Sequence, residues 1–249
     1  MEKRLTILVI AFILLAIALG GCTNPARRVV VTVGPSPTPG AETVTPSPTP
    51  APPTVTASGG VTTARGSGDQ LVKGIMLGEG LYVVSWSGSG TFVSFSLTDI
   101  GGNGGYDMAR GRASGEELLI VDGSAMLSGE FSLMVASDAG WTINIARPDT
   151  SSPSRLPLTV SCSEANGAVT KPFQANEGIL KISYTLSRMP SGTGNVDIFD
   201  ASTGSSFYTR PITAATVGQS TAEVPSDGVY IARVTLPQGA SYAEITISQ

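Results

Sequence analysis

The chain of 249 residues has no histidine and only two cysteines. Without histidine it cannot build a Ser-His-Asp or Cys-His catalytic unit, and it lacks a principal zinc ligand. Only 14% of its residues are charged, its net charge is −4, and its basic residues do not cluster. A weakly acidic chain of this kind is a poor candidate for binding nucleic acid. These absences argue against most hydrolases and against a nucleic-acid partner.

Other catalytic motifs are missing as well. There is no Gly-x-Ser-x-Gly elbow and no Ser-x-x-Lys, and Gly101–Gly105 lacks the Gly-Lys-Ser/Thr of a phosphate-binding loop. Glu116 and Glu117 are adjacent, so on a strand they point to opposite faces and cannot flank one glycosidic bond. We therefore expect no enzyme, with a carboxylate-only hydrolase as the remote alternative.

The N-terminus has the features of an export signal. Lys3 and Arg4 precede an unbroken apolar run, Ile7–Leu19, which is short for a membrane span. The next residues complete the sequence Leu19-Gly20-Gly21-Cys22, which resembles the lipobox of prokaryotic lipoproteins. The resemblance implies removal of residues 1–21 and attachment of lipid to Cys22, on the extracytoplasmic side of the cell membrane. The alternative is an uncleaved transmembrane anchor with an incidental cysteine.

Residues 22–68 differ in composition from the rest. The stretch Gly34–Thr56 holds 8 of the 17 prolines together with many Ser and Thr residues. Such a segment cannot form a ladder or bury a core, and it favours extended polyproline II. We predict a disordered stalk over residues 22–68, either bare or O-glycosylated.

The remaining residues predict an all-β fold. Short runs of Val, Ile, Phe, Tyr, Trp and Thr alternate with turn residues, a pattern typical of β-sandwiches and jelly rolls. The expected strands are Gly80–Trp86, Thr91–Leu97, Glu117–Val121, Gly129–Ala136, Trp141–Ala146, Leu156–Cys162, Gly178–Leu186, Asn195–Phe199, Gly228–Leu236 and Ala240–Ser248.

A weak internal repeat divides this region into two. Gly80–Trp86 aligns with Gly178–Tyr184, and two later segments align in the same order at a similar offset. We predict two tandem jelly-roll-like sandwiches, one over 69–150 and one over 151–249. One larger two-sheet domain is the alternative.

Gly129–Ile145 adds a further resemblance. Its Gly-x-aromatic start, short Asp/Gly turn and Trp-x-Ile-x-Ile ending are similar to the closing hairpin of small extracellular β-sandwich modules, including those appended to secreted peptidases. The resemblance implies an accessory or binding role and no catalytic residue.

Calcium is the one plausible metal. Asp99, Asn103 and Asp107 surround a glycine-rich loop, and Asp197 and Asp200 form a smaller group. Oxygen ligands of this kind suit a hard cation, but Asp and Asn are also ordinary turn residues. We expect no other cofactor.

Aromatic residues provide the other candidate ligand surface. Trp86 and Trp141 lie in apolar alternating runs and are expected in the core. Tyr106, Phe207 and Tyr208 are better placed to meet a ligand, although half-buried strand positions would explain them too.

Cys162 has no expected partner once Cys22 carries lipid. Its alternating surroundings predict a buried, inert thiol.

Taken together, these features predict a non-enzymatic, lipid-anchored binding or adhesion protein that displays β-sandwiches on a stalk. Its partner would be an envelope protein or a glycan. The alternative is a structural envelope component without a discrete ligand site.

Overall fold

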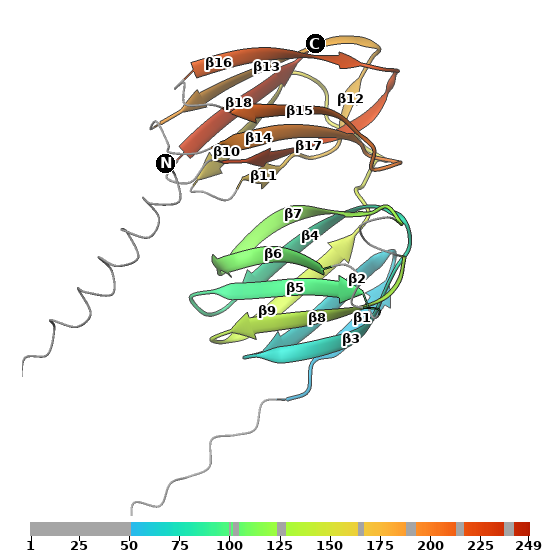
Figure 1. Cartoon of the computed structure of the whole chain (residues 1–249), viewed down its shortest axis with the longest axis vertical. Helices are drawn as coiled ribbons and strands as arrows, with labels where there is room; N and C mark the ends of the chain where they lie inside the picture. Colours follow the sequence, from blue (N-terminus) through green and yellow to red (C-terminus); the bar gives the residue numbers. More distant parts are fainter. Residues whose placement is uncertain are drawn as a thin grey trace, which may run out of the picture. The chain divides into compact units, whose positions relative to one another are not determined.

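The computed structural model describes residues 51–99, 101, 105–123, 128–163, 167–187, 193–212, 217–236 and 242–249 (Figure 1). Residues 48–249 form one compact unit. The described part is all β, with antiparallel pairing between neighbouring strands of every sheet, as the sequence predicts.

The first sandwich consists of two sheets. Sheet A has the order β1-β2-β9-β4-β7 and sheet B the order β3-β8-β5-β6. The strands are β1 Thr54–Ser58, β2 Val61–Ser67, β3 Gln70–Leu77, β4 Gly80–Gly88, β5 Val93–Asp99, β6 Gly105–Arg112, β7 Ser114–Val121, β8 Gly129–Ser137 and β9 Gly140–Ala146.

The second sandwich is built in the same way. Sheet D has the order β10-β18-β13-β16, and sheet C has the order β11-β17-β14-β15 with β12 also paired to β17. The strands are β10 Leu158–Ser163, β11 Ala168–Val169, β12 Phe173–Ala175, β13 Gly178–Leu186, β14 Gly194–Asp200, β15 Ser206–Ile212, β16 Val217–Val224, β17 Gly228–Thr235 and β18 Tyr242–Ser248.

Both sandwiches are jelly rolls, and the sheet orders confirm the predicted repeat. If β2 is counted as strand 1 and β9 as strand 8, the first sandwich has the order 1-8-3-6 in sheet A and 2-7-4-5 in sheet B. The second gives the same orders when β11 and β12 count together as its second strand. The aligned segments Gly80–Trp86 and Gly178–Tyr184 begin β4 and β13, which hold the same place in their sheets.

Alternation of side chains along each strand builds a core inside each sandwich. In the first, Leu97, Phe131 and Ile143 are fully buried, and both Trp86 and Trp141 belong to the core, as expected. The second core includes Ile198 and other fully buried residues, among them Phe173, Leu180, Ile245 and Ile247.

Cys162 is buried in the core of the second sandwich, which confirms its predicted burial. Burial raises the pKa of its thiol to about 11, so the thiol stays protonated at neutral pH.

An aromatic ring lies over a glycine at the same place in both repeats. Trp86 is paired with Gly115, and Tyr184 is paired with Gly218. A Cβ atom added to either glycine would clash with the facing ring. Glycine is therefore required at these positions for the rings to pack.

Strands β1 and β2 correct part of the predicted stalk. Both lie within 22–68, yet β2 pairs along its whole length with β9 and β1 pairs with β2. The Pro-rich composition ends at Pro53, and the Val- and Thr-rich residues that follow need β9 as a partner before they form strands. Residues 22–50 lie outside the described residues, so the stalk stays a prediction there.

A small apolar cluster joins the two sandwiches. Leu81 and Leu118 on the outer face of sheet A pack with Phe199, Ala201 and Ile231 of the second sandwich. All five are buried, with exposed fractions of 5% or less. The outer face of sheet A thus serves partly as an internal interface.

Candidate functional site

The outer face of sheet D is lined mostly by hydrogen-bonding side chains, with the exposed apolar Ile179 and Val217 near the ends of β13 and β16. Its four strands send alternate residues into the second core, and the residues between them point outward. On β13, for example, Leu180 and Ile182 are buried, Lys181 is exposed and Ser183 is partly exposed. The outward set is Thr159, Ser161, Ile179, Lys181, Ser183, Thr185, Val217, Gln219, Thr221, Glu223, Tyr242, Glu244, Thr246 and Ser248.

The register arranges these side chains in rows across the strands. The central row is Thr159, Thr246, Ser183 and Gln219, and it carries no charge. Its members stand one strand apart, about 4.8 Å, because neighbouring strands keep that spacing. The hydroxyl oxygens of Thr159 and Thr246 lie 3.0 Å apart.

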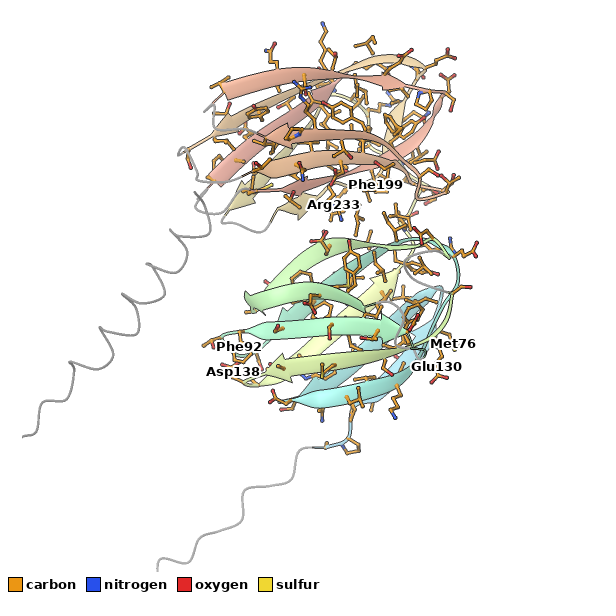
Figure 2. The ribbon with its side chains drawn as sticks, in the orientation of Figure 1. Met76, Phe92, Glu130, Asp138, Phe199 and Arg233 are labelled. Carbon is orange, nitrogen blue, oxygen red and sulfur yellow. The ribbon has the colours of Figure 1, made fainter. Side chains whose placement is uncertain are left out.

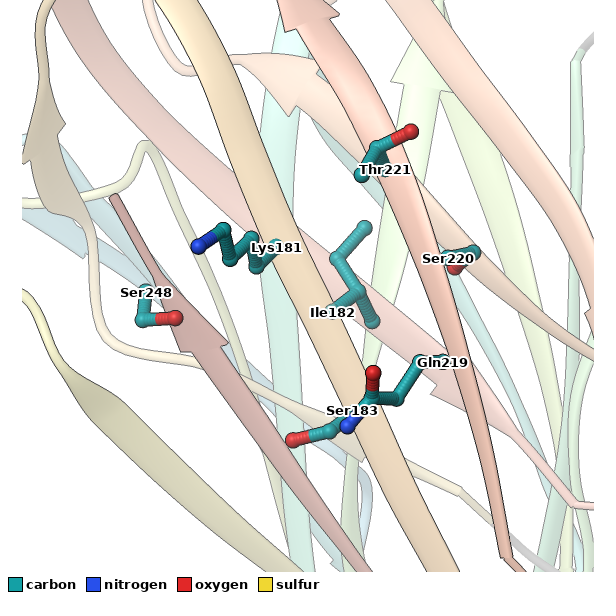
Figure 3. Close-up of a pocket in the computed structure, with 7 residues that line it drawn as sticks. All are labelled: Lys181, Ile182, Ser183, Gln219, Ser220, Thr221 and Ser248. Carbon is teal, nitrogen blue, oxygen red and sulfur yellow. The ribbon is translucent and has the colours of Figure 1, made fainter.

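One row to the side, Thr221, Lys181 and Ser248 lie next to one another in the register. Together with Ser183 and Gln219 of the central row they line a shallow hollow of about 500 Å³ (Figure 3). Its floor includes the buried Ile182.

The hollow combines several kinds of hydrogen-bonding group. The hydroxyl groups and the Gln219 amide both donate and accept hydrogen bonds, whereas the Lys181 ammonium only donates. Such a surface suits a ligand that carries many hydroxyl groups.

The equivalent face of the first sandwich is used differently. Val83 and Leu118 are paired on sheet A, at the positions that Lys181 and Thr221 occupy on sheet D. Val83 and Leu118 belong to the cluster that joins the sandwiches, whereas Lys181 and Thr221 are exposed. At this pair of positions the repeat keeps the geometry of the face and replaces apolar contact residues by polar ones, whereas Ile179, the equivalent of Leu81, stays apolar and exposed.

A polar cluster accompanies the contact between the sandwiches. Arg233 on β17 donates to Oδ2 of the buried Asp197 from Nε at 3.1 Å and from Nη2 at 2.9 Å. Its guanidinium also lies over the Phe199 ring, 5.5 Å from the centroid. Two groups of the first sandwich lie near Nη1 of Arg233. Glu117 Oε1 is 3.7 Å away, and the Tyr106 hydroxyl oxygen is 3.5 Å away.

Glu117 lies on β7, an edge strand of sheet A, and its side chain points to the inner side of the sheet. Glu116 pairs with Ser85 and is exposed, whereas Glu117 pairs with the buried Val84. The two adjacent carboxylates therefore face opposite ways, as predicted. Burial raises the pKa of Glu117, and the nearby Arg233 charge offsets only part of this effect.

The three aromatic residues proposed from the sequence as ligand contacts are all half-buried. Tyr106 packs on the first core and contacts Arg233. Phe207 packs edge-to-face on Tyr230, with centroids 5.0 Å apart, and the Tyr208 hydroxyl donates to Ser220 Oγ at 2.7 Å. These contacts favour the alternative interpretation, in which the three side chains stabilise their strands.

Two of the three candidate calcium ligands of the first sandwich lie within the described residues. Asp99 is buried, whereas Asp107, paired with Ser96, is exposed on the outer face of sheet B. Asn103 lies outside the described residues, so calcium at this loop stays a prediction.

In the second sandwich, Asp197 binds Arg233, and Asp200 Oδ1 accepts hydrogen bonds from the backbone of Ser202 and Thr203. Within the described ranges, no group of three acidic or cysteine side chains is arranged to hold a metal ion.

The polar face of sheet D is the feature that reasoning from the sequence missed. Strands β10, β13 and β18 were expected, and each has Ser or Thr at alternate positions, such as Thr159-x-Ser161 and Thr246-x-Ser248. Strand β16 was not expected, because its inward residues include the small Gly218, Ser220 and Ala222. Without β16 the contribution of Gln219 and Thr221 to this face could not be seen.

Cys22, the predicted lipid carrier, lies outside the described residues. Within the described ranges, no helix has the length and apolar character needed to cross a membrane.

No family model and no curated protein matches the chain. One similar solved structure is the N-terminal CBM22-1–CBM22-2 tandem domain of Xyn10C from Paenibacillus barcinonensis. Its sequence identity to this chain is 9% and the TM-score is 0.22, and the match covers 78% of this chain and 92% of that chain. The tandem CBM51 modules of Sp3GH98, the family 98 glycoside hydrolase of Streptococcus pneumoniae SP3-BS71, have 8% identity, cover 75% of this chain and 84% of theirs, and give a TM-score of 0.26.

A third similar structure is that of PA5104 from Pseudomonas aeruginosa PAO1, with 12% identity, 76% and 79% coverage and a TM-score of 0.21. At these identities and TM-scores the similarities support no conclusion about function.

Proposed function

We propose that this protein is a non-enzymatic, lipid-anchored surface protein that binds glycans on the outer face of sheet D. The supporting observation is the set of polar rows on that face, with the hollow lined by Lys181, Ser183, Gln219, Thr221 and Ser248. Such rows match a ligand that presents hydroxyl groups at regular intervals.

The chemistry of the face suggests weak binding at each site. A net intramolecular hydrogen bond contributes about 1 kcal/mol, since each replaces hydrogen bonds to water. Tyr242, 39% exposed, lies on this face two residues before Glu244, and its hydroxyl donates to Ser161 Oγ at 3.3 Å. With few aromatic rings to stack on a sugar, affinity would depend on many hydrogen bonds and on several protein copies engaging one polymer.

Lipid attachment at Cys22 supplies such multiple copies by holding the proteins on one surface. The change Cys22→Ser tests it directly. We expect loss of metabolic lipid labelling and of processing after Gly21, with no change in the thermal unfolding of the folded part. Normal lipid labelling of this variant would contradict the anchor.

Glycan binding is tested by affinity electrophoresis and a glycan array with the full chain in non-ionic detergent. We expect saturable retention that is lost when Ser183→Val and Gln219→Leu are combined. The matched control is Thr209→Val, which removes an exposed hydroxyl from β15 of sheet C. If the control and the double variant behave alike, the face of sheet D is not the binding site.

A structural role in the envelope is the second candidate. It is favoured by the apolar cluster around Leu118 and Phe199, which makes the two sandwiches one compact unit. Stoichiometric co-purification with one envelope protein, without retention by any glycan, would support this role over glycan binding.

A further inference from the structure

The outer face of sheet B carries an exposed apolar patch on the first sandwich. Leu71, Met76 and Met134 are 54%, 66% and 62% exposed, which is high for large apolar side chains. Leu71 and Met134 are directly paired between β3 and β8, and Met76 is paired with Glu130 (Figure 2). We name these three residues the sheet B patch.

The patch borders a shallow hollow. Leu71, Lys73, Ser132 and Met134 line it together with Thr98 and Asp99, and its volume is about 360 Å³. Methionine suits such a surface because its flexible, polarizable side chain adapts to different contacts. Exposed apolar patches on folded proteins commonly mark interaction sites.

The internal repeat shows what this face does in the other sandwich. Phe131 aligns with Tyr230, so Met134 on β8 corresponds to Arg233 on β17. The register then makes Leu71, the partner of Met134, equivalent to Val169, the partner of Arg233.

In the second sandwich the equivalent positions are covered. Val169 packs on the cluster formed with Leu81 and Leu118, and Arg233 contacts Glu117. The fold therefore already uses this face to dock a neighbouring β-sandwich, and in the first sandwich the same face stays uncovered.

We propose that the sheet B patch binds the same patch on a second copy of this chain, forming a twofold dimer. Lys73 on β3 and Glu130 on β8 are both exposed, so the face offers charges of both signs to a copy of itself. A self-complementary face is what a twofold contact requires.

This contact also leaves both sheet D faces free. Two glycan sites would then act together, although the dimer itself does not depend on glycan binding.

Cysteine cross-linking in native membranes tests the dimer with the full chain. Ser132 lies in the middle of the patch, so Ser132→Cys places a thiol at the proposed contact. With a short bismaleimide we expect a product of twice the chain mass, well above the level given by the unsubstituted chain. Adding Met134→Glu should reduce this product about tenfold, because it places an unpaired charge in the contact.

The matched control is Ser183→Cys, in the middle of the outer face of sheet D. It should give no dimer above background. Equal cross-linking of both variants would indicate random collision and overturn the proposal, as would a cross-link to a different protein or no cross-link at all. Because glycan binding is measured with other variants, either proposal can fail without the other.

Discussion

Replacing Arg233 by Met tests the buried Arg233–Asp197 pair of sheet C, which lies beside the contact between the two sandwiches. Methionine keeps much of the aliphatic stem, which packs near Phe199, and removes the guanidinium. Asp197 then stays buried without its cation, because both of its short contacts come from Arg233.

The expected loss follows from the burial of the pair. Removing one partner of a buried ion pair costs about 3–5 kcal/mol, and the Arg233 side chain is 21% exposed, which favours the lower end. For a unit of this size, a loss of about 3 kcal/mol corresponds to roughly 6–12 °C in the melting temperature.

The assay is urea denaturation followed by tryptophan fluorescence and by circular dichroism. A second variant, Arg233→Met with Asp197→Leu, removes both charges and should recover most of the loss, since an apolar pair can replace a buried ion pair. A free energy of unfolding for Arg233→Met within 0.5 kcal/mol of the parent, a change typical of surface positions, would refute the role of the ion pair. A double variant that loses as much stability as the two single changes added together would refute it as well.

Three further predictions concern other buried positions. Gly218→Val should lower the free energy of unfolding by about 2 kcal/mol, because the new side chain clashes with Tyr184, and urea denaturation measures this. Glu117→Gln should raise the melting temperature at pH 8, because burial raises the folded-state pKa of Glu117 above its usual 4.5 and the charged form is disfavoured. That gain should shrink as the pH falls through the folded-state pKa and vanish below pH about 4, where the carboxyl is protonated in both states; a gain that does not depend on pH would contradict the assignment. Cys162 should react with iodoacetamide at pH 8 only after unfolding, since its pKa is about 11, and rapid labelling of the folded protein in mass spectra would show that the thiol is accessible.

The predicted strands include β4, β9 and β13, which place Val84, Ile143 and Ile182 in the cores. β3 was not predicted, although its inward residues Val72, Ile75 and Leu77 are large and apolar. β16 was not predicted, because its inward Gly218 leaves space for an aromatic ring from another strand and so breaks the apolar alternation. β1 and β2 were not predicted, because Val and Thr next to a Pro-rich stretch form strands only when β9 is available as a partner.

By itself, the sequence determined the all-β class, the tandem repeat and the buried states of Trp86, Trp141 and Cys162, because these depend on local alternation and composition. Tertiary structure decided which faces are polar, apolar or shared. The rows of sheet D join residues more than 80 positions apart, as with Thr159 and Thr246, and the contact between Arg233 and Glu117 spans two domains. Such neighbours depend on strand order and register, which no local pattern encodes. The lack of histidine and the Cys22 motif predicted a displayed binding protein, and the fold then indicated which surfaces could bind.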